Sequence, residues 1–176
     1  MSCCSDTTCE PSGDSTREQV KDYYGKVLQK TSDLKTNACT CAAAPPDDIK
    51  AALARVHDEV TSRYYGCGLT IPRDNLEGLK ILDLGCGAGQ DCYIAAQLVG
   101  ETGEVVGVDM TDEQIQVANQ YIDYHTKEFG YEKPNVRFLQ GYIEKLDELN
   151  LPSDYFDIIM FVTYYSHIVL INMLQV

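Results

Sequence analysis

The chain has few basic residues, and they do not cluster. Its 176 residues include 14 lysines and arginines against 27 aspartates and glutamates, which gives a formal net charge of −13. A surface that follows a nucleic-acid backbone needs clustered positive charge. The composition therefore argues against DNA or RNA as a partner.

The amino terminus lacks a secretory signal. Residues 1–6 are small and polar, and no basic segment followed by an apolar core comes after them. We therefore expect a cytoplasmic protein whose eight cysteines are reduced thiols rather than a disulfide framework. None of them stands at the Cys-x₂-Cys spacing of structural zinc sites. The eight are Cys3, Cys4, Cys9, Cys39, Cys41, Cys67, Cys86 and Cys92.

An apolar segment that runs into a glycine-rich turn is the most informative motif. Residues 79–84 are predicted to form a short buried strand and residues 90–98 a helix, with Gly85, Gly87 and Gly89 between them. Units of this kind place their loop at the carboxyl edge of a parallel sheet, where ligands bind. Glycine lets the backbone turn sharply there and approach a ligand closely.

The spacing of these glycines favours S-adenosylmethionine (SAM) over a dinucleotide. A dinucleotide fingerprint has its third glycine three residues after the second, and here that position is Gln90. The tighter spacing suits a cofactor without a pyrophosphate. A second predicted strand, residues 104–109, ends in Asp109, whose carboxylate can accept hydrogen bonds from ribose hydroxyls. The alternative is a structural glycine turn in some other α/β domain.

The length fits one α/β domain with an appendage, and the sequence divides into four parts. A further helix is predicted over residues 112–129, and strands over residues 135–140 and 156–162. The last part, residues 163–176, is interrupted by polar residues. It is also shorter than the roughly 20 apolar residues of a membrane span, so no membrane anchor is expected. The parts are a disordered, cysteine-containing terminus (1–14), a helical extension with thiol loops (15–78), a partial SAM-binding Rossmann-like domain (79–162) and an apolar tail (163–176).

Helix starts can be placed from capping residues. Residues 15–18 form a capping box, and Asp47 is positioned to cap a second helix. Thr111 and Gln114 form another capping box ahead of residues 112–129. The apolar faces expected on the first two helices are Val20, Tyr23, Tyr24, Val27 and Leu28, and then Ile49, Leu53, Val56 and Val60.

Six motifs spread over much of the chain can be compared with those of known families. They are Tyr23-Tyr24-Gly25, Leu34-Lys35-Thr36-Asn37-Ala38-Cys39, Arg63-Tyr64-Tyr65-Gly66-Cys67-Gly68-Leu69, the glycine loop, Val108-Asp109-Met110-Thr111 and residues 141–146. Together, over about residues 17–159, they resemble the amino-terminal half of the arsenite methyltransferases. The glycine loop is shared by many methyltransferases, so the blocks at residues 34–39 and 63–69 are the specific part.

The resemblance implies a class I SAM-dependent methyltransferase that methylates arsenite held by soft cysteine thiolates, an activity of arsenic detoxification. By this similarity, Cys39 and Cys67 match arsenic-binding cysteines, and Cys41 is an alternative to Cys39 in the same loop. The implied partners are arsenite or an arsenic–thiol conjugate and a thiol reductant of the glutathione or thioredoxin type. The expected cofactor-binding residues are Tyr65, Asp83, Gly85, Cys86, Gly87, Gly89, Asp109, Met110, Thr111, Ile143 and Glu144.

The chain departs from the family's pattern after Ile159. Where the family has a Ser-Asn-Cys segment, this chain has Phe161-Val162-Thr163, and the family's third and fourth arsenic-site cysteines are absent. We interpret the domain as truncated after its fourth strand, with residues 160–176 arising from splicing or a gene-model error. Two alternatives stay open: a non-catalytic remnant that binds only SAM or arsenic, and a methyltransferase for another small molecule.

Overall fold

The computed structural model describes residues 13–28, 45–65, 69–163 and 166–171. Disorder was predicted for residues 1–14. Residues 1–12 of that stretch lie outside these ranges, as do the candidate thiols Cys39, Cys41 and Cys67. For Gly13 and Asp14 the prediction is wrong, because both belong to a helix.

The described strands form one sheet in the order β3-β2-β1-β4-β5. The first four strands are mutually parallel, which confirms the predicted Rossmann-like arrangement. Their bounds are Lys80–Leu84 for β1, Glu104–Asp109 for β2, Val136–Gln140 for β3 and Ile158–Thr163 for β4.

A fifth strand, β5 (Ser166–Ile171), runs antiparallel to β4, with Thr163 paired to Ser166. The sequence did not predict it, because residues 163–176 are apolar without a clear period. Only two residues separate the ends of the two strands. A parallel return needs a crossover of a dozen or more residues, whereas a hairpin can be this short, so the short connection dictates the antiparallel direction.

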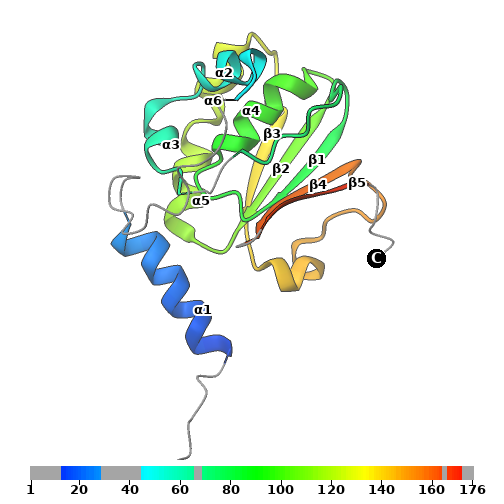
Figure 1. The fold of residues 1–176 in the computed structure, drawn as a ribbon. Helices are drawn as coiled ribbons and strands as arrows, with labels where there is room; N and C mark the ends of the chain where they lie inside the picture. The colour runs from blue at the N-terminus through cyan, green and yellow to red at the C-terminus, as the bar shows by residue number, and fades with distance from the viewer. Residues whose placement is uncertain (1–12, 29–44, 66–68, 164–165, 172–176) are drawn as a thin grey trace, which may run out of the picture.

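Helices cover one face of the sheet, and a shorter layer covers the other (Figure 1). On the helical face, α4 and α5 pack on the strands, and α2 packs on the outside of α4. The opposite face carries the 3₁₀ segment η3 (Ile143–Leu149). The helices of the first layer are α4 (Gln90–Val99), α5 (Asp112–Gln120) and α6 (Ile122–Phe129), with α2 (Asp47–Leu53) and α3 (Asp58–Ser62) outside them.

Alternate residues of each central strand enter different hydrophobic clusters. In β1, Ile81 belongs to the large cluster under the helices, whereas Leu82 belongs to the small cluster under η3. The same alternation separates Val105 from Val106 in β2. Strands covered on both faces are expected to be continuously apolar, which is why the strand positions could be predicted closely.

The amino-terminal helix differs from its prediction. The helix α1 (Gly13–Asp22) begins two residues before the capping box and continues into a π-helical turn, η1 (Tyr23–Val27). The prediction that its apolar face is buried holds for Leu28, which is 1% exposed. It is wrong for Val20 and Val27, which are 39% and 56% exposed. For Val20 the reason is that α1 extends away from the body (Figure 1).

Two predicted helices are each divided in two. The helix predicted over residues 112–129 breaks at Tyr121, between α5 and α6. The helix expected after Asp47 breaks between α2 and α3, although Ile49, Val56 and Val60 are buried as predicted. Two capping predictions are also wrong. The residue before α2 is Pro46 rather than Asp47, and Thr111 makes no capping bond with its side chain.

A buried histidine joins the helical extension to the Rossmann-like domain. The Nε2 of His125 accepts a hydrogen bond from the backbone N–H of His57 at 3.1 Å, and its Nδ1 lies 2.8 Å from the carbonyl oxygen of Tyr121. The ring also stacks on Tyr93, with centroids 3.6 Å apart. Burial lowers the pKa of His125 to about 4, so this ring is neutral at physiological pH and can accept the His57 bond.

Among the described residues, none of the helices combines the length and the apolar character that crossing a membrane requires.

Candidate active site

The glycine loop between β1 and α4 is tied to the end of β2. The backbone N–H groups of Gly85 and Cys86 both donate to the carbonyl oxygen of Val108, at 2.7 and 3.0 Å. Gly85, Gly87 and Gly89 have φ values of +86°, +54° and +86°. Side-chain-bearing residues rarely adopt this left-handed region, so the loop needs glycine at all three positions.

The three glycines do not face the same surroundings. A Cβ atom added at Gly85 or Gly87 would meet no heavy atom within 4 Å. At Gly89 it would lie 2.6 Å from the ring of Phe138. The first two glycines therefore present bare backbone to open space, where a ligand can approach, while Gly89 packs against the core and supports the loop.

Asp109 organises the loop from the end of β2. Its Oδ2 accepts a hydrogen bond from the N–H of Gly87 at 2.9 Å, and its Oδ1 accepts one from the N–H of Thr111 at 2.8 Å. Each carboxylate oxygen has two lone pairs, so both keep acceptor capacity for a ligand hydroxyl. Because Asp109 is only half-buried, it can hold the loop and still contact a ligand.

The turns that follow β2 and β3 meet beside this carboxylate. The N–H of Gly141 donates to the carbonyl oxygen of Asp109 at 3.0 Å, and Nε2 of Gln140 donates to that of Met110 at 3.2 Å. Ile143, 53% exposed, and Glu144, also exposed, lie at the start of η3. The structure thus places the predicted residues of both turns along one edge of the sheet; Gln140, which the sequence analysis missed, supports Met110.

The side chain of Asp83 is buried near the end of β1. Asp83 is 4% exposed, and its Oδ2 accepts a hydrogen bond from the thiol of Cys92 in α4 at 3.2 Å. It is paired across β1 and β2 with Gly107. The cofactor contact expected of Asp83 from the sequence stays a prediction.

Phe138, Cys86 and Cys92 fill the space that Gly107 leaves empty. A Cβ atom on Gly107 would lie 2.7 Å from Cδ1 of Phe138, 2.8 Å from Sγ of Cys86 and 2.9 Å from Sγ of Cys92. Glycine in a central strand often marks such a close approach. Burial raises the pKa of Cys86 to about 11 and that of Cys92 well above its ordinary value. Both thiols are therefore neutral at physiological pH.

The buried Asp83 carboxyl group gives stability a pH dependence. Burial, with the charge of Asp91 as the second cause, raises the pKa of Asp83 to about 7. Between its ordinary value near 4 and this value, the folded chain keeps a proton that the unfolded chain loses. Asp83 therefore lowers stability as the pH rises through that window. We expect Asp83→Asn to gain about 4 kcal/mol relative to the parent between pH 4 and pH 8.

Urea denaturation of parent and variant at pH 4, 6 and 8 measures this difference. The variant must be compared with the parent at each pH, because His125 also titrates in this range. The pKa of His125 is lowered to about 4, and its effect on stability has the opposite sign to that of Asp83. Its folded form binds fewer protons than the unfolded chain between about pH 4 and 6.5, so its contribution to stability rises with pH. A variant-minus-parent difference that stays constant with pH would contradict the assignment to Asp83.

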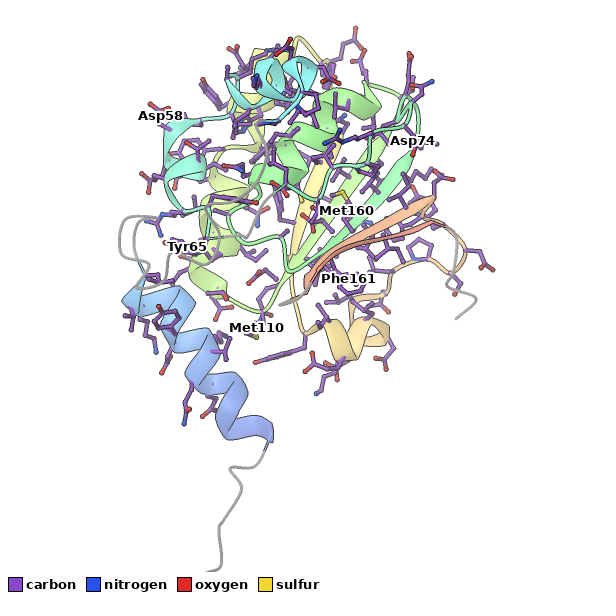
Figure 2. The ribbon with its side chains drawn as sticks, in the orientation of Figure 1. Asp58, Tyr65, Asp74, Met110, Met160 and Phe161 are labelled. Atoms are coloured by element: carbon purple, nitrogen blue, oxygen red, sulfur yellow. The ribbon has the colours of Figure 1, made fainter. Side chains whose placement is uncertain are left out.

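The two segments that carry the candidate arsenic-binding thiols begin at adjacent points. Leu28 precedes residues 29–44, and its carbonyl oxygen accepts a hydrogen bond from the hydroxyl of Tyr65 at 3.0 Å. Tyr65 is the last described residue before the segment that contains Cys67. In Figure 2, Tyr65 is labelled near the body end of α1, and Met110 near the end of β2.

The turn η1 packs over the start of α5. A Cβ atom on Gly25 would lie 2.5 Å from Oε2 of Glu113 and 3.0 Å from Cγ2 of Thr111. Lys21 forms an ion pair with Asp112 at 2.8 Å. These contacts explain the glycine of the Tyr-Tyr-Gly motif, and they place the end of the amino-terminal helix beside the turn that follows Asp109.

Within the part of the chain that the structure describes, no group of three or more His, Cys, Asp or Glu side chains could hold a metal ion. The predicted arsenic ligands Cys39, Cys41 and Cys67 lie outside that part. Their grouping around arsenic therefore stays a prediction.

A small substitution tests whether SAM binds on the open side of the glycine loop. Gly87→Ala adds a methyl group that meets no protein atom but would crowd a ligand on the bare backbone. Overpacking of this size costs about 1–3 kcal/mol, so we expect SAM affinity to fall about 5- to 150-fold. Titration calorimetry with SAM measures the effect.

The matched control is Gly130→Ala, which has φ +81° and open space around an added Cβ but lies at the carboxyl end of α6. Both variants lose about 1–2 kcal/mol of stability from the left-handed backbone, but the control keeps the parent's affinity for SAM. Equal SAM affinities for the two variants would place the ligand elsewhere.

Comparison with known proteins adds independent observations. A family model described as a methyltransferase domain matches residues 75–171. The chain is 51% identical over 148 residues to an arsenite methyltransferase of Mus musculus, and these residues cover 84% of this chain and 39% of that protein. It is 54% identical over 143 residues to an arsenite methyltransferase of Aquipseudomonas alcaligenes, covering 81% of this chain and 40% of that protein.

A solved structure has the same arrangement. It is an arsenic(III) S-adenosylmethionine methyltransferase from Chlamydomonas reinhardtii, 48% identical in sequence, with a TM-score of 0.64. The match covers 67% of this chain and 39% of that one. This chain therefore spans about two fifths of the length of these relatives.

Proposed function

This chain belongs to the arsenite methyltransferase family, and on that basis we propose that it transfers a methyl group from SAM to trivalent arsenic held by cysteine thiolates. The single observation that carries the proposal is the glycine loop. Its backbone is bare at Gly85 and Gly87, and it is bonded to the Asp109 carboxylate.

The residues of the loop fit SAM. The open space above Gly85 and Gly87 is a cradle that side chains would fill, and Asp109 keeps acceptor capacity for the ribose hydroxyls. The backbone of Cys86, with Met110, Thr111, Ile143 and Glu144, lines the same edge. When bound there, SAM supplies a methyl group on a positively charged sulfonium.

The proposed substrate is arsenite or an arsenic–thiol conjugate, bound by Cys67 together with Cys39 or Cys41. Trivalent arsenic is soft and favours thiolate sulfur, as soft metals do. Bound through sulfur, it keeps a lone pair, which is the nucleophile toward the methyl group. No general base is needed, because arsenic has no proton to lose. The protein contributes position, which can lower a barrier by about 7–11 kcal/mol.

A reductant is required between successive transfers. Transfer of the methyl cation to the arsenic lone pair breaks the bond between sulfur and methyl, releases S-adenosylhomocysteine and raises arsenic formally from the trivalent to the pentavalent state. A thiol reductant of the glutathione or thioredoxin type then supplies two electrons, becoming a disulfide, and restores the lone pair that another methylation needs. We infer a reducing compartment, the cytoplasm, because the proposed thiolates and the thiol reductant must stay reduced. Methylation there would serve arsenic detoxification.

Mass spectrometry of arsenic species tests the proposal. The chain is incubated with arsenite, SAM and glutathione, and a methylated arsenical is expected that is absent when SAM is omitted. Thermal melting with and without SAM is measured on the same sample, because ligand binding raises the melting temperature by mass action. A melting shift without product would exclude catalysis and support the alternative of a chain that binds SAM without turnover.

A further inference from the structure

The turn η1 covers a residue that belongs to the proposed cofactor edge. A Cβ atom on Gly25 would lie 3.0 Å from Cγ2 of Thr111, so η1 approaches this side chain as closely as backbone can. Thr111 is 2% exposed, and its N–H donates to Oδ1 of Asp109 at 2.8 Å. The residue under η1 is therefore bonded directly to the carboxylate proposed to hold the ribose of SAM.

A lysine at the end of α1 reaches both turns of that edge. Nζ of Lys21 lies 2.8 Å from Oδ2 of Asp112 at the start of α5. The hydrogen bond to Asp112 raises the pKa of Lys21 above its ordinary value, and Tyr142 contributes in the same direction, so Tyr142 also lies near this ammonium group. Asp112 follows the turn after β2, and Tyr142 lies in the turn after β3. The end of α1 thus spans the two turns that carry the predicted cofactor residues.

Exposed apolar side chains gather in the same region. Of the four large apolar side chains that are exposed among the described residues, Val20 and Val27 lie on the segment that crosses this edge, and Ile143 follows Tyr142. Gathered apolar side chains on a surface indicate that it binds a partner or a ligand. SAM bound at this edge would cover part of that apolar surface.

The segment is anchored to the body at one end. Leu28 is 1% exposed, and its carbonyl oxygen accepts a hydrogen bond from the hydroxyl of Tyr65. From there the chain passes back through η1, a π-helical turn, into α1, which extends away from the body (Figure 1). Turns of this kind are frequent at functional sites. The ion pair of Lys21 with Asp112 is exposed, and exposed ion pairs are weak, so this end can separate from the body more easily than Leu28.

We propose that residues 20–28 form a cap on the cofactor edge, held in place by Lys21 and Gly25 as positioning residues, and that the cap slows the release of bound SAM. The inference rests on the proposed function but concerns the binding of SAM only. Neither positioning residue takes part in methyl transfer. Because the ion pair is weak, the cap can open to admit SAM and to let S-adenosylhomocysteine leave.

Lys21→Met tests the cap, because it removes the ion pair with Asp112 and keeps the aliphatic part of the side chain. We expect SAM to dissociate about 2- to 5-fold faster than from the parent, the range that an exposed ion pair contributes. Lys21→Arg keeps a cation in the same place and should retain the parent's rate. Displacement of labelled SAM by an excess of unlabelled SAM measures the rate.

Lys26→Met is the matched control. Lys26 pairs with Asp22 at 2.7 Å, and both residues lie on the amino-terminal segment. This variant therefore loses the same charge and an ion pair of the same kind, while the contact between Lys21 and Asp112 remains. Its rate of SAM dissociation should equal the parent's.

Gly25→Ala tests the close approach of η1 to Thr111. Gly25 lies inside a helical turn and outside the left-handed region, so alanine fits its backbone, and only the contacts of the added methyl group oppose it. Overpacking of this kind should speed SAM release about 5-fold or more. Hydrogen exchange gives an independent measurement. SAM should slow exchange of the backbone amides of residues 21–28 in the parent, and this slowing should be lost in Gly25→Ala.

The outcomes separate this inference from the proposed function. If the parent does not bind SAM, both are overturned. If the parent binds SAM but Lys21→Met releases it at the parent's rate, or SAM leaves the exchange of residues 21–28 unchanged, the cap is wrong and the proposed function is unaffected. If Lys21→Met and Lys26→Met speed release equally, the effect is one of net charge, and the inference is overturned.

Discussion

Replacing Gly89 with alanine is expected to lower the free energy of unfolding by about 2–5 kcal/mol. A Cβ atom at this position would lie 2.6 Å from the ring of Phe138, and overpacking of this kind costs about 1–3 kcal/mol. The backbone has φ +86° and ψ 16°, where a side chain adds about 1–2 kcal/mol. Urea denaturation at pH 7 measures the change in the free energy of unfolding. Loss of a cooperative transition would mean that the destabilisation lies at the upper end of the expected range.

Gly130→Ala again provides the control, because its backbone angles, φ +81° and ψ 23°, match those of Gly89. Nothing lies within 4 Å of its added Cβ atom, so only the backbone penalty of about 1–2 kcal/mol applies. Equal losses in the two variants would mean that Phe138 moves aside freely and that Gly89 is not packed as described.

Replacing Cys67 with serine is expected to reduce arsenite affinity by more than about 100-fold, while the affinity for SAM stays at the parent's value. Loss of an outer partner already costs a metal site about 10- to 100-fold, and loss of a direct ligand should exceed that. The serine hydroxyl is a hard oxygen that stays protonated at neutral pH, so it cannot replace a soft thiolate. Equilibrium dialysis with arsenite and calorimetry with SAM measure the two affinities.

Cys92→Ser is the matched control for Cys67→Ser. Cys92 is fully buried and donates to Asp83, a bond that a serine hydroxyl can also make. Its arsenite affinity should therefore equal the parent's. Unchanged arsenite binding in Cys67→Ser would remove the basis for arsenic as substrate and favour a methyltransferase that acts on another small molecule.

The features predicted best are those that depend on residues close together in the sequence. The continuous apolar character of Ile81 and Leu82 marks a strand covered on both faces, whatever it packs against. The left-handed backbone of Gly85 and Gly87 is likewise a local requirement, and it leads directly to the bare loop. Asp109 could be placed because it ends the next strand, and the ends of adjacent parallel strands share one edge.

The features missed by the sequence analysis depend on residues far apart in the chain. In the sequence, Gly107 is simply a glycine inside a predicted strand. Only the structure shows that the side chains of Cys86 and Cys92 lie in the space beside it. Asp83 stands two residues before Gly85, and only the structure shows that it is buried and bonded to Cys92 of α4. Asp91 shows in the sequence only as an acidic residue in a first helical turn, which is common.

Local chemistry alone was sufficient for the loop and for the sheet edge that a cofactor would use, because glycine conformation and apolar periodicity act within a few residues. The family was indicated by the resemblance of whole motifs, chiefly those at residues 34–39 and 63–69. Three features were decided only by packing. They are the side chains that reach the open side of that edge, the direction in which α1 extends from the body, and the antiparallel direction of β5. These outcomes depend on which surfaces meet after the chain collapses. The hydrogen bond between Thr70 and Asp91, for example, joins residues with twenty positions between them, so no short stretch of sequence indicates it.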